Sequence, residues 1–237
     1  MNISAPALEV EGLTSGYGEA MVIRDVGVTV PAGQILAILG KNGMGKSTLL
    51  KTVMGFLPAT KGRVRVSGED VTNLAPYRIA RRAIAYSPQD QAIFQDLTVD
   101  ENLRLGLGMQ TDYAQGLERV SGFFPFLAQR RRQRAGTLSG GEQKMLLVAR
   151  ALLSKPRLML VDEITEGLQP SVIQKLADVL RVERAALGMG VLLIEQNVRF
   201  AMQVADRYAV LKRGEIVDQG ATSTPGIEAR INEYLTV

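Results

Sequence analysis

The sequence has 237 residues, of which 46% are hydrophobic and 22% are charged. This composition is typical of a globular protein with a sizeable core, and it excludes a disordered chain or a disulfide-stabilised miniprotein. Lys and Arg number 28 against 24 Asp and Glu, and the net charge of +4 is too small and too dispersed to indicate a nucleic-acid partner. The chain has no Cys and no His, so any catalysis must use carboxylate, amine, hydroxyl or amide groups.

The first part of the chain alternates strand-like and turn-like segments. Residues 7–13 and 21–30 are β-rich, and the apolar run 34–39 enters a glycine-rich turn. A helix is predicted from Gly45 to about Met54, because a glycine and then a proline follow it. Strand, glycine loop and helix in this order predict a nucleotide-binding α/β core.

The middle of the chain has helical spacing and few β-branched runs. A helix is expected over residues 141–154, with Met145, Ala149, Leu152 and Leu153 on one face. Alternation of strands and helices then resumes, with a helix at 171–186 and strands at 158–162, 191–195, 207–211 and 215–218. Apolar strands that alternate with helices predict a mainly parallel sheet covered on both faces.

We therefore expect a single domain that spans residues 1–237. Its nucleotide-binding core is predicted to comprise residues 1–88 and 157–237, with a helical insertion at residues 89–156. Apolar runs are strand-sized, far shorter than the roughly 20 residues that span a bilayer, and the N-terminal residues do not have the pattern of a secretory signal.

Residues 40–47 match the phosphate-binding loop pattern, and they occur between a predicted strand and a predicted helix. Glycines let the backbone curl so that its N–H groups point at phosphate oxygens, and the helix N-terminus adds its positive dipole. Lys46 is expected to contact the outer phosphates, and the Ser47 hydroxyl is expected to bind Mg²⁺. The residues predicted to bind nucleotide here are Gly40, Lys41, Asn42, Gly43, Gly45, Lys46, Ser47 and Thr48.

Two adjacent acids end the apolar strand 158–162. Asp162 is expected to orient Mg²⁺ through its water shell, and Glu163 is expected to polarise the attacking water. Phosphoryl transfer depends mainly on positioning and charge stabilisation, so two acids with different tasks suit this chemistry.

Residues 138–143, Leu-Ser-Gly-Gly-Glu-Gln, open the amphipathic helix of the middle region. Ser139, Gly140 and Gly141 leave unpaired N–H groups at a helix start, which is an anion receptor. With the two preceding motifs, this segment resembles the signature of ATP-binding cassette (ABC) ATPases, and the resemblance covers nearly the whole chain. It implies an α/β fold of the P-loop NTPase (RecA-like) type, with a mainly parallel sheet core, an N-terminal antiparallel β subdomain and an inserted helical subdomain.

The resemblance also implies ATP and Mg²⁺ as cofactors, and a nucleotide-sandwich dimer in which the signature of one subunit closes on ATP at the phosphate loop of another. Tyr17 resembles the aromatic residue that stacks on adenine, and Gln89 resembles the glutamine that contacts Mg²⁺. Gln196 stands where a switch histidine is usual; its amide can donate a hydrogen bond to the γ-phosphate but carries no charge. The implied metal-binding residues are Ser47, Gln89 and Asp162, and the implied catalytic residues are Glu163, Lys46 and Gln196.

Two further departures from the family pattern follow the acidic pair. Ile164 replaces a proline that commonly follows the glutamate, and Gln169 stands where many relatives have aspartate in the loop between subunits. Hydrolysis is still expected, but these residues leave its rate and the intersubunit coupling open.

Residues 165–170 and 195–197 resemble most the ATP-binding subunits of branched-chain amino acid importers, especially the shorter of the two that such systems use. Urea and short-chain amide importers share much of this pattern. A non-transport ABC ATPase acting on nucleic acid or ribosomes, and a scaffold that binds ATP but barely hydrolyses it, are the alternatives from other classes. An importer implies a second, identical or homologous ATPase subunit, two integral membrane permease subunits, indirectly a periplasmic or extracellular solute-binding protein, and a peripheral location at the cytoplasmic face of the inner membrane.

A run of arginines precedes the signature: Arg130, Arg131, Arg132 and Arg134. Such a run is typically a solvated face, and contact with a permease loop or with anionic lipid headgroups is the alternative.

Overall fold

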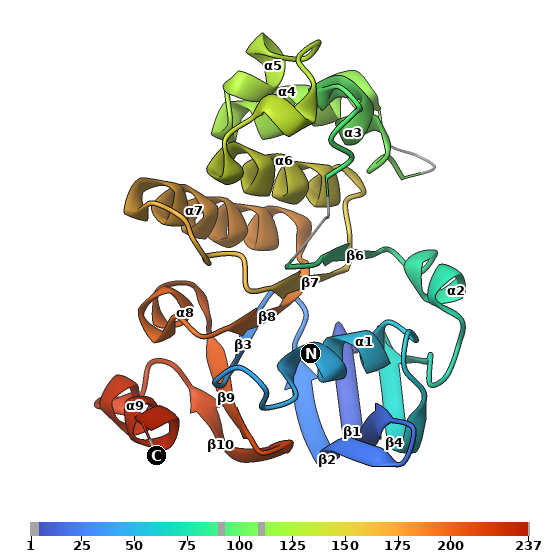
Figure 1. Ribbon diagram of the computed structural model, residues 1–237, viewed down its shortest axis with the longest axis vertical. Coiled ribbons are helices and arrows are strands. Elements are labelled where there is room, and N and C mark those ends of the chain that lie inside the picture. The colour runs from blue at the N-terminus through green and yellow to red at the C-terminus, as the bar shows by residue number, and fades with distance from the viewer. Residues whose placement is uncertain (1–4, 90–92, 109–111, 237) are drawn as a thin grey trace.

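The computed structural model describes residues 5–89, 93–108 and 112–236. Its elements form two sheets, with helices above and between them (Figure 1). The smaller, antiparallel sheet has the order β2-β1-β4-β5, with strands β1 (Leu8–Tyr17), β2 (Ala20–Val30), β4 (Ala59–Val66) and β5 (Glu69–Asp70). This is the N-terminal antiparallel subdomain expected from the resemblance.

The larger sheet has six strands in the order β10-β9-β3-β8-β7-β6. Five of them are parallel, and β10 pairs antiparallel with β9 at one edge. The strands are β3 (Ile35–Leu39), β6 (Ile84–Ser87), β7 (Leu158–Asp162), β8 (Gly190–Glu195), β9 (Arg207–Lys212) and β10 (Glu215–Ala221). The mainly parallel sheet predicted from the sequence is therefore confirmed.

The larger, six-stranded sheet, called the central sheet below, divides the hydrophobic core into two layers. Alternate residues of β3 point to opposite faces because side chains alternate along a strand: Ile35 and Leu39 pack into one layer, and Leu36 and Ile38 into the other. The second layer also holds the apolar face of α1 (Lys46–Val53), which lies between the two sheets (Figure 1). The phosphate-loop segment thus connects two elements, β3 and α1, that are both packed in the core.

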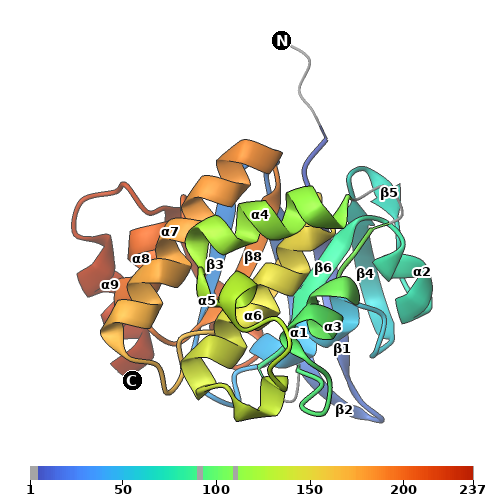
Figure 2. The ribbon, with the colours of Figure 1, turned by 90° about the horizontal axis from the view of Figure 1, so that it is seen from above.

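Helices cover the opposite face of the central sheet. Next to the sheet lie α7 (Pro170–Leu187) and α8 (Val198–Val204), and α6 (Gly140–Leu153) packs on both α7 and β6 (Figure 1). Seen from above, α4 (Tyr113–Phe123) crosses over α6 (Figure 2). The remaining helices are α2 (Pro76–Ala80), α3 (Val99–Arg104), α5 (Phe126–Gln129), the 3₁₀ turn at Ala135–Thr137 and α9 (Ile227–Thr236).

Helices α3 to α6 all lie between β6 and β7 along the chain. The boundaries 1–88, 89–156 and 157–237 stay a prediction, and residues 90–92 and 109–111 of the middle range lie outside the described residues. Within the described part of the chain, each helix is too short or too polar to cross a membrane.

Candidate nucleotide-binding site

The phosphate-loop segment connects β3 to α1. Gly45 is the N-cap of α1, and its φ of 103° lies in the left-handed region that favours glycine. A Cβ atom at this position would also lie 2.8 Å from Ile23 Cγ2 of β2, so the close approach of the two segments requires a glycine. The start of α1 in turn lines a cavity beside the loop.

That space is an open cavity of about 190 Å³. The residues that line it come from the loop, from the start of α1, from β2 and from two distant segments: Val22, Asn42, Gly43, Gly45, Lys46, Ser47, Thr48, Gln89 and Glu163. The structure therefore brings six of the eight predicted phosphate-loop residues together with Gln89 and Glu163, whereas Gly40 and Lys41 do not line this cavity. A cavity at the carboxyl ends of parallel strands is where ligands bind in open α/β sheets.

Lys46 is a buried cation at the floor of this cavity. Its ammonium group donates hydrogen bonds to the carbonyl oxygens of Gly40 and Lys41, at 2.8 and 3.0 Å, and forms an ion pair with Glu163 Oε1 at 2.9 Å. The side chains of Lys46 and Glu163 are only 3% and 5% exposed. The lysine charge is thus neutralised by Glu163 and held against two carbonyl oxygens of the phosphate-loop segment.

The Glu163 carboxylate contacts three side chains of the site. Its Oε2 atom accepts hydrogen bonds from the amide of Gln89 at 3.2 Å and from the amide of Gln196 at 3.0 Å. Its backbone has a φ of 44°, and its N–H donates to Ile194 of β8 at 2.9 Å. Gln89, Gln196 and Lys46 therefore all contact one carboxylate, although they come from three separate parts of the chain.

Asp162 precedes Glu163 at the end of β7 and is 4% exposed. Burial, together with the charge of Glu163, raises the pKa of Asp162 to about 6, although a hydrogen bond with the Ser47 side chain lowers it. Within the described residues, Asp162 Oδ1 is a buried oxygen without a hydrogen-bond partner. An unpaired carboxylate oxygen beside a hydroxyl is a donor set that suits Mg²⁺.

The described residues hold no cluster of three or more His, Cys, Asp or Glu side chains that could bind a metal. The predicted ligands Ser47, Gln89 and Asp162 supply a hydroxyl, an amide and one carboxylate. This set fits an ion that is also held by phosphate oxygens and water, as Mg²⁺ is with nucleotides, because Mg²⁺ keeps several waters and takes few protein carboxylates.

The signature segment lies elsewhere in the molecule. Ser139 is the N-cap of α6 and forms a capping box with Glu142: Ser139 Oγ accepts the Glu142 N–H at 3.3 Å, and Glu142 Oε2 accepts the Ser139 N–H at 3.0 Å. Ser139 and Gly140 are exposed, and a Cβ atom at Gly140 would meet nothing within 4 Å. Ser139, Gly140 and Gly141 do not line the cavity, so this helix start faces outward.

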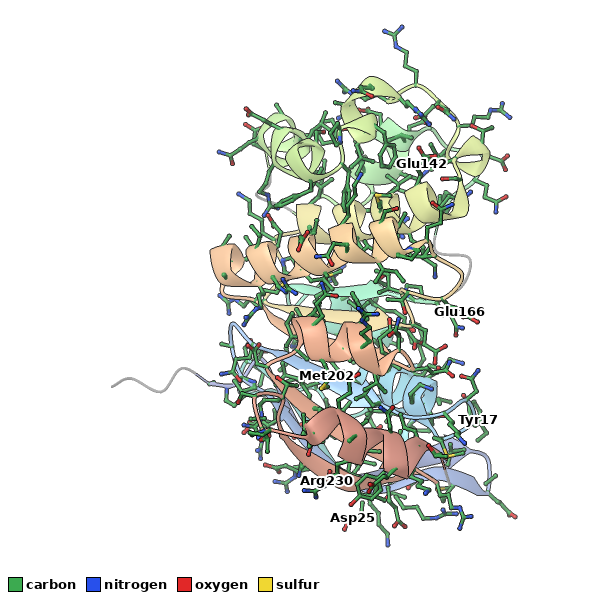
Figure 3. The ribbon with its side chains drawn as sticks, turned by 90° about the vertical axis from the view of Figure 1, so that its left-hand side faces the viewer. Tyr17, Asp25, Glu142, Glu166, Met202 and Arg230 are labelled. Atoms are coloured by element: carbon green, nitrogen blue, oxygen red, sulfur yellow. The ribbon has the colours of Figure 1, made fainter. Side chains whose placement is uncertain are left out.

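Figure 3 shows the arrangement along one edge of the molecule. Tyr17, Glu166 and Glu142 lie along the same side of the view, with Glu166 between the other two. Tyr17 ends β1, and its ring is 50% exposed, but it does not line the cavity. The end of β1 at Tyr17 and the first turn of α6 at Glu142 thus lie on the same side of the molecule.

The arginine run that precedes the signature is partly engaged in ion pairs. Arg130 contacts Glu142 at 3.0 Å, and Arg131 contacts Asp100 of α3 at 2.6 Å. These two arginines hold the loop between α5 and α6 against the helices. The side chains of Arg130 and Arg131 are nevertheless 47% and 43% exposed, so the run lies on a solvated face as expected, with acidic partners for these two residues.

Sequence reasoning missed four residues that support the site. Lys144 donates to the Gln89 carbonyl at 2.5 Å, and Glu166 accepts from the Gln89 amide at 2.6 Å. Glu195 contacts Thr165 beside Glu163. Two of them could have been suspected from their place in the sequence. Glu195 ends a predicted strand beside Gln196, and Lys144 lies on the signature helix.

Comparisons with known proteins agree with this geometry. Residues 23–166 match the protein family described as ABC transporter. The chain is 43% identical over 219 residues to the high-affinity branched-chain amino acid transport ATP-binding protein BraG of Pseudomonas aeruginosa, covering 90% of this chain and 93% of the relative. It is 35% identical over 214 residues to the probable branched-chain amino acid transport ATP-binding protein LivF of Archaeoglobus fulgidus, covering 89% and 90% of the two chains.

Solved structures give the same result at the level of the fold. A nucleotide-free ATP-binding cassette from an ABC transporter superposes with a TM-score of 0.82 at 26% identity, covering 95% of this chain and 94% of the other. The family match spans residues 23–166, which include every cavity residue except Val22, and the relatives and the shared fold extend over nearly the full length of the chain. The chain belongs to the ABC transporter family.

Proposed function

We propose that this chain is the ATP-binding and ATP-hydrolysing subunit of an ABC importer, and that it energises the uptake of branched-chain or other hydrophobic amino acids through partner permeases. The observation that carries the ATPase activity is the convergence of Lys46, Gln89 and Gln196 on the Glu163 carboxylate beside the phosphate loop. The substrate class rests on the similarity to BraG and LivF, whose names state branched-chain amino acid transport.

In this mechanism, Lys46 turns its charge from Glu163 to the outer phosphates of ATP. Glu163, released from the lysine, accepts a hydrogen bond from the attacking water and takes its proton. The Gln196 amide, which lies 3.0 Å from Glu163 Oε2, holds the carboxylate or donates to the γ-phosphate. When bound at Ser47, Gln89 and Asp162, Mg²⁺ supplies positive charge that neutralises the phosphates.

A second ATPase subunit completes each site in this proposal. The N-terminus of α6 presents the N–H groups of Gly140 and Gly141, whereas the capping box occupies that of Ser139, contrary to the sequence expectation, and this helix start lies away from the cavity of its own chain. The start of α6 therefore suits phosphate bound to a facing subunit. An exposed Tyr17 ring suits stacking on adenine.

Two permease subunits are the proposed membrane partners, and they place the chain peripherally at the cytoplasmic face of the inner membrane. Phe94 and Leu105 are 56% and 57% exposed. Phe94 packs against the Arg150 guanidinium at 5.7 Å, and Gly106, next to Leu105, is tightly packed against the Arg150 backbone. These exposed apolar side chains flank α3 in the region between β6 and β7, and the contact of Lys144 on α6 with Gln89 links that region to the cavity.

The proposal is tested by uptake in cells that lack this chain and carry plasmid-borne variants. Wild type should restore uptake of radiolabelled leucine, isoleucine and valine, whereas Lys46→Ala and Glu163→Gln should not. Lys175→Ala is the control, because Lys175 is an exposed lysine of α7 outside the site. Restoration of urea or acetamide uptake alone would assign the chain to the other importer class instead.

A second measurement tests the activity on the purified chain. Lys46→Ala should lose ATP affinity in calorimetry, and Glu163→Gln should bind ATP without releasing phosphate. Unchanged ATP binding by the Lys46 variant, or undiminished phosphate release by the Glu163 variant, would refute the roles given to these residues. Co-purification of ribosomes or nucleic acid in place of permeases would favour a non-transport ABC protein.

A further inference from the structure

Glu195 is a buried acid that the proposed mechanism does not use. It ends β8, the strand between β3 and β7, and it is 2% exposed. Glu183 is equally buried, but it is paired with the Arg119 guanidinium. Among the described residues, Glu195 has no such cationic partner in an ion pair. A buried carboxylate of this kind is costly unless hydrogen bonds hold it in place.

The hydrogen bonds of Glu195 go to two different turns. Oε1 accepts the Thr165 N–H at 3.2 Å, and Oε2 accepts the Thr165 hydroxyl at 2.9 Å. Oε2 also accepts the Asn197 N–H at a long 3.5 Å, and the Asn197 side chain in turn caps α8 through Phe200 N–H at 3.0 Å. Both carboxylate oxygens are thus occupied by donors from the turn after β7 and the turn after β8.

These two turns carry the residues that meet at the candidate reaction centre. Thr165 lies two residues after Glu163, and Gln196 follows Glu195 directly. Glu163 has a left-handed backbone with a φ of 44°, which is uncommon for a residue with a side chain and persists only where neighbouring contacts hold it. Its N–H contact to Ile194 fixes one end of the turn, and the Glu195 contacts to Thr165 fix the other.

We infer that Glu195 is a positioning residue: by binding Thr165, it holds the turn that carries Glu163 and the turn that carries Gln196 in one fixed relation. The consequence is that the Gln196 amide stays within hydrogen-bond distance of the Glu163 carboxylate, at 3.0 Å. This inference rests on the proposed function, because it gives Glu163 the task of activating water. It assigns to the buried acid a role in the rate of hydrolysis and none in nucleotide binding.

The test compares Thr165→Val, Thr165→Ser and Glu195→Gln in the full chain, by single-turnover hydrolysis of radiolabelled ATP with protein in excess. Thr165→Val removes the hydroxyl at nearly constant volume, whereas Thr165→Ser retains it. We expect the hydrolysis rate of Thr165→Val and Glu195→Gln to fall by at least about tenfold, with the Kd for ATP within about twofold of wild type. Thr165→Ser should remain close to wild type.

Thr222→Val is the matched control, because it deletes a hydroxyl that donates to the Ala205 carbonyl at 2.6 Å outside the site. Thermal unfolding of each variant gives the folded fraction, to which the rates are normalised. If Thr165→Val does not fold, the comparison of Glu195→Gln with Thr165→Ser decides. Wild-type rates in Thr165→Val and Glu195→Gln, or a parallel loss of ATP affinity, would overturn the inference.

Glu163→Gln in the same assay separates this inference from the proposed function. If Glu163→Gln is inactive and the Thr165 and Glu195 variants are as fast as wild type, only the positioning role fails. If Glu163→Gln hydrolyses ATP as fast as wild type, both the proposed function and the positioning role fail.

Discussion

Lys46 Nζ and Glu163 Oε1 lie 2.9 Å apart in a pair that is almost entirely buried. Lys46 follows β3, Glu163 follows β7, and β8 lies between these two strands in the sheet. Because all three strands are parallel, their carboxyl ends meet at one edge, and the two charges come together there. The lysine expected to bind phosphate is therefore occupied by the carboxylate expected to activate water.

The first prediction concerns this competition. Glu163→Gln removes the charge that holds Lys46 and that repels the triphosphate, so its affinity for ATP should increase by about three- to tenfold, which corresponds to about 1 kcal/mol. Isothermal titration calorimetry with wild type and variant measures the change. A Kd for ATP that is equal to or weaker than that of wild type would show that the ion pair does not oppose binding.

Gln196 gives the second prediction. Its amide donates to Glu163 Oε2 at 3.0 Å, and a histidine at this position could donate through an imidazole N–H instead. Gln196→His should keep the single-turnover rate within about threefold of wild type, whereas Gln196→Ala should lose about tenfold or more, because a hydrogen bond to a charged group is worth about 1.5–3 kcal/mol.

The pH dependence distinguishes the two side chains. An imidazole titrates at about pH 6.5, so the hydrolysis rate of Gln196→His, divided by that of Gln196→Ala, should change near that pH. The rate of wild type, divided by that of Gln196→Ala, should show no such change. A histidine variant that is as slow as the alanine variant would show that the amide is specifically required.

Glu195 gives a prediction on stability. Burial raises the pKa of Glu195 to about 7, and the charge of Glu163 adds to this, although hydrogen bonds from Thr165 and Asn197 lower it. A carboxyl whose pKa is higher in the folded state binds its proton more tightly there. Its contribution to stability is therefore complete below its ordinary pKa and is lost as the pH rises through about 7.

The free energy of unfolding of wild type, minus that of Glu195→Gln, should accordingly decrease by roughly 3 kcal/mol between pH 4.5 and pH 7.5. Urea denaturation of both proteins across this range measures the difference, and the subtraction removes the titration of Asp162 and of other groups common to both. A difference that is constant or increases with pH would contradict the raised pKa.

Asp100 gives a prediction of the opposite sign. Burial raises the pKa of Asp100, but hydrogen bonds from Tyr113, Arg104 and Arg131 outweigh it, and the pKa falls to about 2. The contribution of Asp100 to stability is present above its ordinary pKa and is lost as the pH falls towards 2. Asp100→Asn should therefore lower the free energy of unfolding at pH 7 by about 1–3 kcal/mol.

Urea denaturation at pH 7 and at pH 3 measures this effect, which should shrink at the lower pH. Asp178→Asn is the control, because Asp178 is 54% exposed and lies 3.8 Å from Arg181 in a weak surface pair. Equal losses of stability for the two variants would show that the Asp100 contacts have no special value.

Several parts of the fold followed from the sequence because they are encoded locally. The strand at 158–162 was predicted with its observed bounds, and α6 begins one residue before the expected start. Glycines, capping residues and apolar periodicity act over a few positions and are legible without knowledge of the rest of the chain. The strand Ala59–Val66 and the helices Val198–Val204 and Ile227–Thr236 were not predicted, because their patterns are short or mixed.

The sequence by itself determined the chemistry of this protein: which lysine, acids and amides are present, and which segments would form the phosphate loop and the signature helix. Only the tertiary structure decided their partners. The contacts of Glu163 with Lys46, of Gln89 with Lys144 and of Glu195 with Thr165 join residues 30 to 117 positions apart. Such contacts depend on which strands lie side by side, and strand order is fixed by the packing of the whole core, which no local pattern contains.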